Sequence, residues 1–131
     1  MTVITFGTFD LLHVGHVRLL QRAARLGDRL VVGVSTDALN LKKKGKLPVF
    51  RERDRLEIVK ALHCVDEVFL EESLEQKREY VLRFQARILV MGADWEGRFD
   101  ELSEICDVRY LPRTGGISTT EIVASVSSPA A

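Results

Sequence analysis

Short apolar runs rich in β-branched residues alternate along the chain with longer stretches in which hydrophobic residues recur every three to four positions. Runs of the first kind are typical of buried strands, and stretches of the second kind are typical of helices with one apolar face. The predicted strands span residues 3–6, 30–34, 65–70, 87–91 and 108–111. The predicted helices span residues 14–26, 52–62, 74–85, 99–105 and 119–126, with a short additional helix that is capped by Ser35 or Thr36 and ends at residue 41.

Strands that alternate with helices indicate an α/β fold. We predict a single doubly wound domain with a five-stranded, mainly parallel sheet and Rossmann-like connections. The chain of 131 residues is long enough for one core of this kind, so residues 1–126 are assigned to the domain and residues 127–131 to a frayed tail. Ligands of such sheets bind beyond the carboxyl ends of the strands. Residues 42–48 show no hydrophobic period and are predicted to form a loop.

The charge balance excludes one large class of partner. Nineteen Lys and Arg residues face nineteen Asp and Glu residues, so no overall basic field is available to hold a nucleic acid. No apolar run approaches the roughly 20 residues that a membrane-spanning helix needs, and the first residues lack the plan of a signal peptide. We therefore expect a cytoplasmic protein with no membrane insertion. The two cysteines show neither a metal-binding nor a disulfide pattern.

The first segment with candidate chemistry is Gly-Thr-Phe-Asp-Leu-Leu-His-Val-Gly-His at residues 7–16, between the first strand and the first helix. Backbone N–H groups and the positive end of a helix dipole favour a phosphate at this place. His13 and His16 are three residues apart and can point toward the same ligand, while Gly15 leaves room for a close approach to the backbone. Two such histidines could simply cap and pack a helix, but their position after a strand and a Gly-Thr turn favours a phosphate site.

The second segment, Arg-Thr-Gly-Gly-Ile-Ser-Thr-Thr at residues 113–120, follows the last strand and opens the last helix. Ser118 and Glu121 fit a capping box, which explains those two residues alone. Arg113, two glycines and three hydroxyl side chains supply donors and a flexible backbone suited to phosphate oxygens. The sequence therefore predicts two anion-binding segments that face one cleft.

These two motifs resemble those of the HxGH nucleotidyltransferase superfamily, specifically its cytidylyltransferase branch, and within it the bacterial glycerol-3-phosphate cytidylyltransferases that make CDP-glycerol for teichoic acid synthesis. The HxGH motif is shared with enzymes that transfer adenylyl groups, whereas the second motif is more specific to the cytidylyl branch. The resemblance covers residues 3–122 and includes further matches at residues 35–37, 65–68, 75–77 and 91–97.

The resemblance implies a Rossmann-like nucleotidyltransferase that moves CMP from CTP to a small phosphorylated acceptor, with glycerol 3-phosphate expected first. His13 and His16 would hold the triphosphate and stabilise negative charge as the α-phosphorus is attacked in line and pyrophosphate leaves. The acceptor phosphate has a second pKa of about 6 and is already mostly dianionic near neutral pH, so positioning and charge neutralisation suffice. Magnesium would bridge the triphosphate without a dedicated protein carboxylate cluster, and a homodimer is expected.

Candidate residues follow from the matched motifs. His13, His16, Arg113 and Lys44 are the predicted catalytic residues. The residues predicted to bind the nucleotide are Thr8, Phe9, Asp10, Gly15, Lys46, Asp94, Thr114, Gly116, Ile117, Ser118, Thr119 and Thr120. Asp10 and Asp94 could also contribute to the outer shell of the magnesium ion, and Asp94 could orient acceptor hydroxyls.

The acceptor site is predicted from Lys43, Lys44, Lys77, Arg55 and His63. A lysine run is usually a solvated surface, but this one lies near a cleft that must admit a second anion. Lys44 and Lys46 match two family lysines best, with Lys43 in reserve. Lys77 and Arg55 also match family positions, although each could equally be an ordinary surface charge.

Two departures from the family pattern bear on the acceptor. His63 stands where the relatives have an arginine, which replaces a permanent cation by a group that is largely neutral above a pKa of about 6.5. Gly115 stands where the second motif has an acidic residue. Two alternative acceptors, another phosphorylated polyol and phosphoethanolamine, therefore stay open, and so does ATP as the donor. A non-catalytic nucleotide sensor is a further alternative, which the retention of both histidines and Arg113 disfavours.

Overall fold

A computed structural model describes residues 1–112 and 118–127, so Arg113, Thr114, Gly115, Gly116 and Ile117 lie outside the described residues. Five strands form one sheet in the order β3-β2-β1-β4-β5, and all four pairings are parallel. This confirms the predicted α/β fold. The strands are β1 (Thr2–Gly7), β2 (Arg29–Ser35), β3 (Glu67–Glu71), β4 (Ile88–Gly92) and β5 (Asp107–Leu111).

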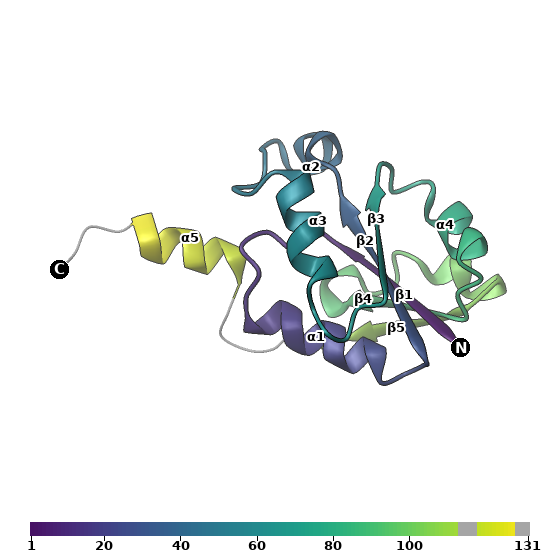
Figure 1. Cartoon of the computed structure of the whole chain (residues 1–131). Coiled ribbons are helices and arrows are strands. Elements are labelled where there is room, and N and C mark those ends of the chain that lie inside the picture. The colour runs from purple at the N-terminus through teal and green to yellow at the C-terminus, as the bar shows by residue number, and fades with distance from the viewer. Residues whose placement is uncertain (113–117, 128–131) are drawn as a thin grey trace.

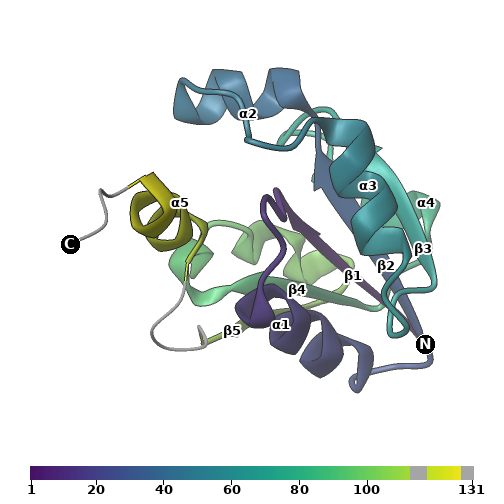
Figure 2. The same cartoon turned by 60° about the vertical axis from the view of Figure 1, so that its left-hand side comes forward.

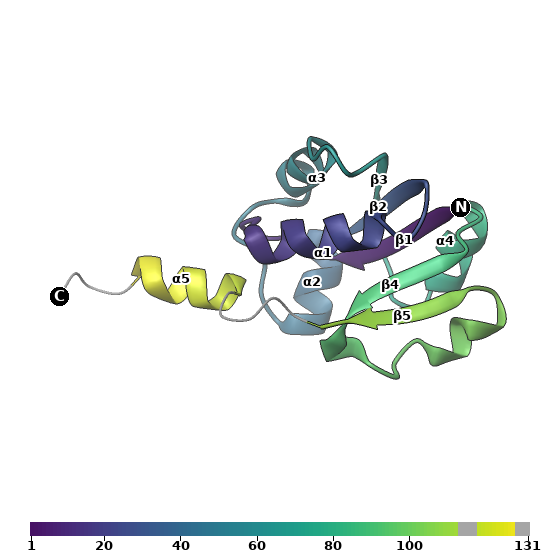
Figure 3. The ribbon, with the colours of Figure 1, turned by 90° about the horizontal axis from the view of Figure 1, so that it is seen from below.

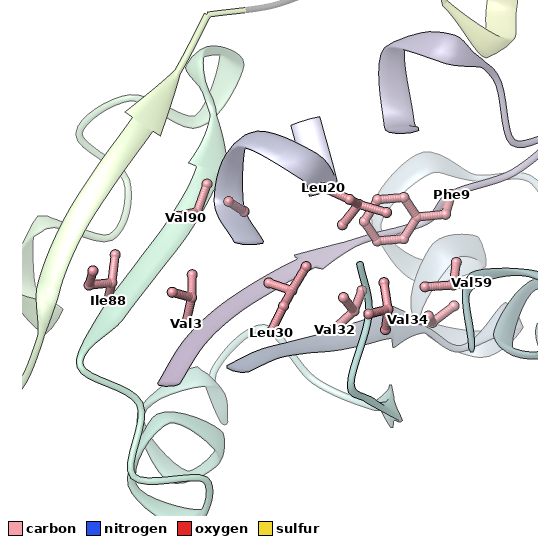
Figure 4. Close-up of a cluster of buried hydrophobic side chains, with 11 residues drawn as sticks. Val3, Phe9, Leu20, Leu30, Val32, Val34, Val59, Ile88 and Val90 are labelled. Atoms are coloured by element: carbon pink, nitrogen blue, oxygen red, sulfur yellow. The ribbon is translucent and has the colours of Figure 1, made fainter. Parts of the chain in front are cut away.

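Helices cover both faces of the sheet (Figure 1). On one face α1 (Val14–Ala24) and α3 (Glu52–Lys60) pack against alternate residues of β1, β2 and β4, and the resulting core is drawn in Figure 4. On the other face α4 (Lys77–Arg83) and the 3₁₀ helix η2 (Asp100–Glu104) pack against the intervening residues, which include Ile4, Val31 and Leu89. Because successive side chains of a strand point to opposite faces, strands buried on both sides read as continuous apolar runs.

Three further elements lie at the carboxyl edge of the sheet: α2 (Asp37–Lys44), the 3₁₀ helix η1 (Ala93–Trp95) and α5 (Thr119–Ser127). Figure 2 shows α2, α5 and the loop that leads into α1 around the carboxyl end of β1. Figure 3 shows α5 beyond the arrowheads of β4 and β5. Within the described residues, no helix is long and apolar enough to cross a membrane.

The predicted end of the second helix is wrong. The lysine run was predicted to be a loop, but α2 continues through Lys44 and ends at Gly45, whose φ of 75° lies in the left-handed region. A glycine in this conformation directly after a helix is a common C-terminal cap. The lysines lie in the last turn of α2, where positive charge also offsets the negative end of the helix dipole.

Candidate active site

A cavity of about 1020 Å³ lies at the carboxyl edge of the sheet and collects most of the predicted site. One side, here called the histidine wall, consists of residues 7–16. A second part of the lining, the lysine wall, carries Lys43, Lys44 and Lys46, and a third part comes from the start of α5. The predicted residues that line the cavity are Thr8, Phe9, Asp10, His13, Gly15, His16, Lys43, Lys44, Lys46, Lys77, Asp94, Ser118, Thr119 and Thr120.

The two histidines cap the helix that carries them. His13 is the N-cap of α1, and its Nδ1 accepts a hydrogen bond of 3.0 Å from the backbone N–H of Gly15. His16 Nδ1 accepts a hydrogen bond of 3.1 Å from the backbone N–H of His13. Each ring therefore uses its Nδ1 as an acceptor, so the proton of each neutral imidazole is assigned to Nε2. The capping interaction and the catalytic prediction are thus compatible, because capping fixes the tautomer in which Nε2 is a donor.

His16 is uncharged near neutral pH. Burial and, to a smaller extent, His13 lower the pKa of His16 to about 4, against the opposing effect of the nearby Asp10. The two imidazole rings are stacked with centroids 3.8 Å apart, an arrangement that two imidazolium cations would resist. The histidine wall thus provides oriented hydrogen-bond donors to phosphate oxygens rather than fixed positive charge.

The loop before the histidines has a strained backbone. Phe9 and Leu11 have φ values of 54° and 48°, in the left-handed region that non-glycine residues rarely adopt. The Phe9 ring packs over Gly7, where an added Cβ would lie 2.9 Å from the ring. Thr119 at the start of α5 donates a hydrogen bond of 2.8 Å to the carbonyl of Asp10. Tertiary contacts of this kind hold a loop in a conformation that its own sequence does not favour.

The Asp10 carboxylate fastens the histidine wall to the segment after α2. One of its oxygens accepts from the Val49 N–H at 2.7 Å and the other from the Phe50 N–H at 2.9 Å. Each oxygen of this side chain, which was predicted as an outer-shell metal contact, thus accepts one backbone hydrogen bond. Among the residues that the structure describes, no three His, Cys, Asp or Glu side chains gather into a metal site.

Arg55 was predicted to contact the substrate, and the structure contradicts this. Its side chain is fully buried behind the cavity, where Nη1 donates to the carbonyls of Thr8 at 2.9 Å and Ser35 at 2.7 Å. Nε donates to the Phe50 carbonyl at 2.9 Å, and Nη2 forms an ion pair with Asp37 at 2.8 Å. A buried guanidinium needs such partners on every side, and here they tie the ends of β1 and β2 to the start of α3.

His63 was also predicted to belong to the acceptor site and does not. It lies exposed in the connection between α3 and β3, which enters β3 at its amino end. The next residues confirm the location, since the Asp66 N–H donates to the carbonyl of Leu30 at the start of β2. The cavity lies at the opposite edge of the parallel sheet, and His63 is not among the residues of this chain that line it.

The lysine wall has the opposite electrostatic character from the histidine wall. Burial lowers the pKa of Lys43 to about 8, with Glu71 opposing the shift and Lys44 adding to it. Burial also lowers the pKa of Lys44, helped by the charge of Lys46. Lys44 Nζ lies 3.5 Å from the Thr8 hydroxyl on the histidine wall. Lys43 is partly buried and Lys44 and Lys46 are exposed, and ammonium groups that repel one another at a cavity favour the binding of an anion.

Two buried residues of the site were not predicted. Asn40 accepts a hydrogen bond of 2.8 Å from the Thr8 hydroxyl and donates to Ser35 and Thr36, so it sets the distance between the two walls. Glu71 is 1% exposed and forms an ion pair with Lys77, which is 2% exposed, at the inner end of the cavity. No sequence motif distinguishes either residue, although a glutamate at the end of a buried strand indicates a buried charge that needs a partner.

The start of α5 completes the mouth of the cavity. Ser118 Oγ accepts a hydrogen bond of 3.1 Å from the Glu121 N–H, the cap that the S-x-x-E pattern predicted. Ser118, Thr119 and Thr120 line the cavity beside the histidine wall. The rest of the second motif falls in residues 113–117, and the roles predicted there stay predictions.

Comparisons with known proteins find relatives over nearly the whole chain. The family model described as "Cytidylyltransferase-like" matches residues 4–125. The glycerol-3-phosphate cytidylyltransferase of Bacillus subtilis (strain 168) is 50% identical over 125 residues, which cover 95% of this chain and 96% of that protein. The protein of the same name from Staphylococcus aureus (strain NCTC 8325 / PS 47) is 47% identical, with 92% and 90% covered. The crystal structure of a lipopolysaccharide core biosynthesis protein from Thermoplasma volcanium GSS1 superposes with a TM-score of 0.73 at 29% identity, covering 89% of this chain and 98% of that one.

Proposed function

The chain belongs to the cytidylyltransferase-like family, and on this premise we propose that it transfers the cytidylyl group of CTP to glycerol 3-phosphate, giving CDP-glycerol and pyrophosphate. Relatives named for this reaction match nearly the whole chain at 47–50% identity. The observation that carries the proposal is the cavity itself. Two histidines and three lysines line it together, a set of donors and cations suited to the reaction of two anions.

A phosphate oxygen of the acceptor is the nucleophile. With a second pKa of about 6, it is mostly dianionic near neutral pH, so no general base is needed. One of its oxygens forms a bond to the α-phosphorus of CTP while the bond to the bridging oxygen between the α- and β-phosphates breaks, and that electron pair leaves with pyrophosphate. In-line displacement of this type depends on positioning and on stabilising the charge of the phosphate oxygens.

Each wall of the cavity has one task in this reaction. His13 and His16 donate Nε2–H bonds to the phosphates of CTP, on the side where charge accumulates as pyrophosphate leaves. Lys44 and Lys46 neutralise the repulsion between nucleotide and acceptor, and Ser118 and Thr119 donate to the nucleotide from α5. Arg113 and Thr114 are assigned to the nucleotide phosphates through the family motif. Magnesium enters as part of the MgCTP substrate.

Two further expectations accompany the proposal. We propose that the enzyme acts in the cytoplasm, where both substrates are found, and that it forms a homodimer. The second expectation is tested by sedimentation equilibrium at micromolar protein concentration, where a mass of twice the 14.8 kDa chain is expected. A single species with the mass of one chain would contradict it.

The decisive experiment measures pyrophosphate release with magnesium and either CTP or ATP. Acceptors to compare are glycerol 3-phosphate, phosphoethanolamine and other phosphorylated polyols. CTP with glycerol 3-phosphate should be the fastest pair by at least an order of magnitude. Turnover with ATP alone would overturn the assignment of the donor. Turnover of CTP with a different acceptor alone would overturn the assignment of glycerol 3-phosphate while leaving cytidylyl transfer intact.

A further inference from the structure

The inner end of the cavity contains a buried ion pair whose acidic member has no role in the reaction as described so far. Glu71 is the last residue of β3 and Lys77 is the first of α4. Lys77 Nζ donates to Glu71 Oε2, and both side chains are almost fully buried. Both residues nevertheless line the cavity. The pair therefore forms the floor of the site and is not part of the core beneath it.

The surroundings of the pair make each charge depend on the other. Lys77 Nζ lies 4.2 Å from the ring centroid of Phe6 and 4.9 Å from that of Phe99, so aromatic carbon replaces water around the ammonium group. Burial raises the pKa of Glu71 and lowers the pKa of Lys77, and in each case the partner's charge opposes the shift. Without Glu71, the Lys77 ammonium would keep the full cost of burial with little compensation.

The lysine wall faces the same carboxylate. Lys43 on α2 is attracted to Glu71, and its Nζ lies 5.9 Å from the centroid of the Trp95 ring. Lys43 is also repelled by the cations Lys44, Lys77 and Arg55, and Lys77 is also attracted to Glu75 on the loop before α4. One buried carboxylate thus stabilises the charged form of two lysines that reach the cavity from different elements.

A role in stability alone explains this arrangement poorly. Replacing a buried ion pair by apolar residues of similar size is often neutral or stabilising, so an ion pair at the floor of a ligand cavity adds little that hydrophobic packing could not supply. A phosphorylated acceptor, in contrast, needs an ammonium group that is charged and held in place before the acceptor arrives.

We propose that Glu71 is a positioning residue for the phosphorylated acceptor. Its carboxylate keeps Lys77 protonated and fixed at the inner end of the cavity, so that the ammonium group contributes to the affinity for glycerol 3-phosphate and not to that for CTP. This inference rests on the proposed function, since it assigns the acceptor to the end of the cavity away from His13 and His16.

The first test is Glu71→Gln, which removes the charge and keeps the shape. The Michaelis constant for glycerol 3-phosphate should rise by roughly tenfold or more, the size expected when a charge-assisted hydrogen bond is weakened, while the Michaelis constant for CTP stays within about twofold. Glu72→Gln removes an exposed carboxylate one residue later and should leave both constants unchanged. Equal effects of Glu71→Gln on both substrates, or a lower melting temperature with neither constant changed, would overturn the proposal.

The pH dependence separates positioning from a structural effect. In Glu71→Gln the pKa of Lys77 falls further, so the ratio of its acceptor Michaelis constant to that of the wild type should grow as the pH rises from about 7 to about 9. Glu71→Asp retains the charge and should keep the wild-type pH profile with a smaller loss of affinity. A ratio that does not change with pH contradicts the proposal. If Glu71→Gln does not fold, the test rests on Glu71→Asp, which should raise the Michaelis constant for glycerol 3-phosphate and not that for CTP.

A double-mutant comparison tests whether Glu71 acts through Lys77. Lys77→Met should raise the acceptor Michaelis constant, and adding Glu71→Gln to it should produce little further change. Fully additive effects would contradict the inference. Wild-type turnover with CTP and glycerol 3-phosphate is measured in the same series. Absence of wild-type turnover would contradict the proposed function, whereas wild-type turnover with no acceptor-specific defect in the variants contradicts the role of Glu71 alone.

Discussion

The histidine wall and the lysine wall of the cavity prepare for anions in different ways. His16 is neutral near pH 7 because burial lowers its pKa to about 4, and backbone hydrogen bonds orient both imidazole rings. Lys43 and Lys44 are cations with lowered pKa values, and Lys44 Nζ lies 3.5 Å from the Thr8 hydroxyl of the histidine wall. One wall therefore supplies geometry and the other supplies charge, and substitutions on the two walls should alter different kinetic constants.

The largest effect is expected from Arg55, which holds both walls in register. Arg55→Met leaves the carbonyls of Thr8, Ser35 and Phe50 and the carboxylate of Asp37 without their buried donor. Breaking a buried pair of this kind costs about 3–5 kcal/mol, so urea unfolding should show a loss of that size in the free energy of unfolding.

Arg53→Met is the matched control, because Arg53 is exposed on the same helix. Its free energy of unfolding should stay within about 0.5 kcal/mol of the wild type. Equal stability of the two variants would show that Arg55 does not hold the walls together.

A smaller but catalytically specific effect is expected on the histidine wall. His16→Ala and His16→Gln both remove the Nε2–H donor and should lower kcat by about 10²–10³-fold, as seen when one preorganised donor is lost. The two variants differ in stability, because a glutamine at the third helical position can still accept the His13 N–H as in a capping box.

Thermal unfolding therefore accompanies the kinetics of these variants. His16→Gln should melt close to the wild type, and His16→Ala should lose about 0.5–2 kcal/mol for the weakened cap. A His16→Gln enzyme with full turnover would mean that the imidazole serves the helix and not the reaction.

The lysine wall should respond to pH where the histidine wall does not. Lys43 has a pKa of about 8, and its charged form exists below that value, so affinity for an anionic substrate should weaken as the pH rises through 8. His16, already neutral above pH 4, contributes no change in this range.

Lys43→Arg gives the sharpest check of this difference. A guanidinium stays charged throughout the range, so the Michaelis constants of this variant should be less dependent on pH between about 7 and 9 than those of the wild type. Identical pH profiles would show that Lys43 does not meet an anion in the cavity.

The fold was largely predictable because its signals are local. All five strands were predicted, since each contains a short run of β-branched or other apolar residues, and the central strands β1, β2 and β4 are buried on both faces. The end of α2 was predicted too early, although Gly45 marked it, because charged residues in a last turn carry no hydrophobic period. Local signals were also sufficient for the helix cap at Ser118.

The site was only partly predictable because its supporting contacts are long-range. Nothing local in the sequence shows that Phe9 and Leu11 adopt left-handed conformations, since tertiary contacts impose them. The partners of Arg55 come from three separate segments, so a buried role could not be distinguished from a substrate contact. Glu71 was missed for the same reason, because its partner Lys77 joins it only through the packing of α4.

The smallest effect is expected at His63, and it tests whether the comparison of the two walls describes the whole acceptor site. His63 is exposed at the amino edge of the sheet, while both walls lie at the carboxyl edge. Restoring the arginine of the relatives by His63→Arg should therefore leave the Michaelis constants for CTP and glycerol 3-phosphate within about twofold, and the free energy of unfolding within about 0.5 kcal/mol. A selective fall in the acceptor constant would show that charge outside the two walls reaches the acceptor, and the division between geometry and charge would then fail to account for its binding.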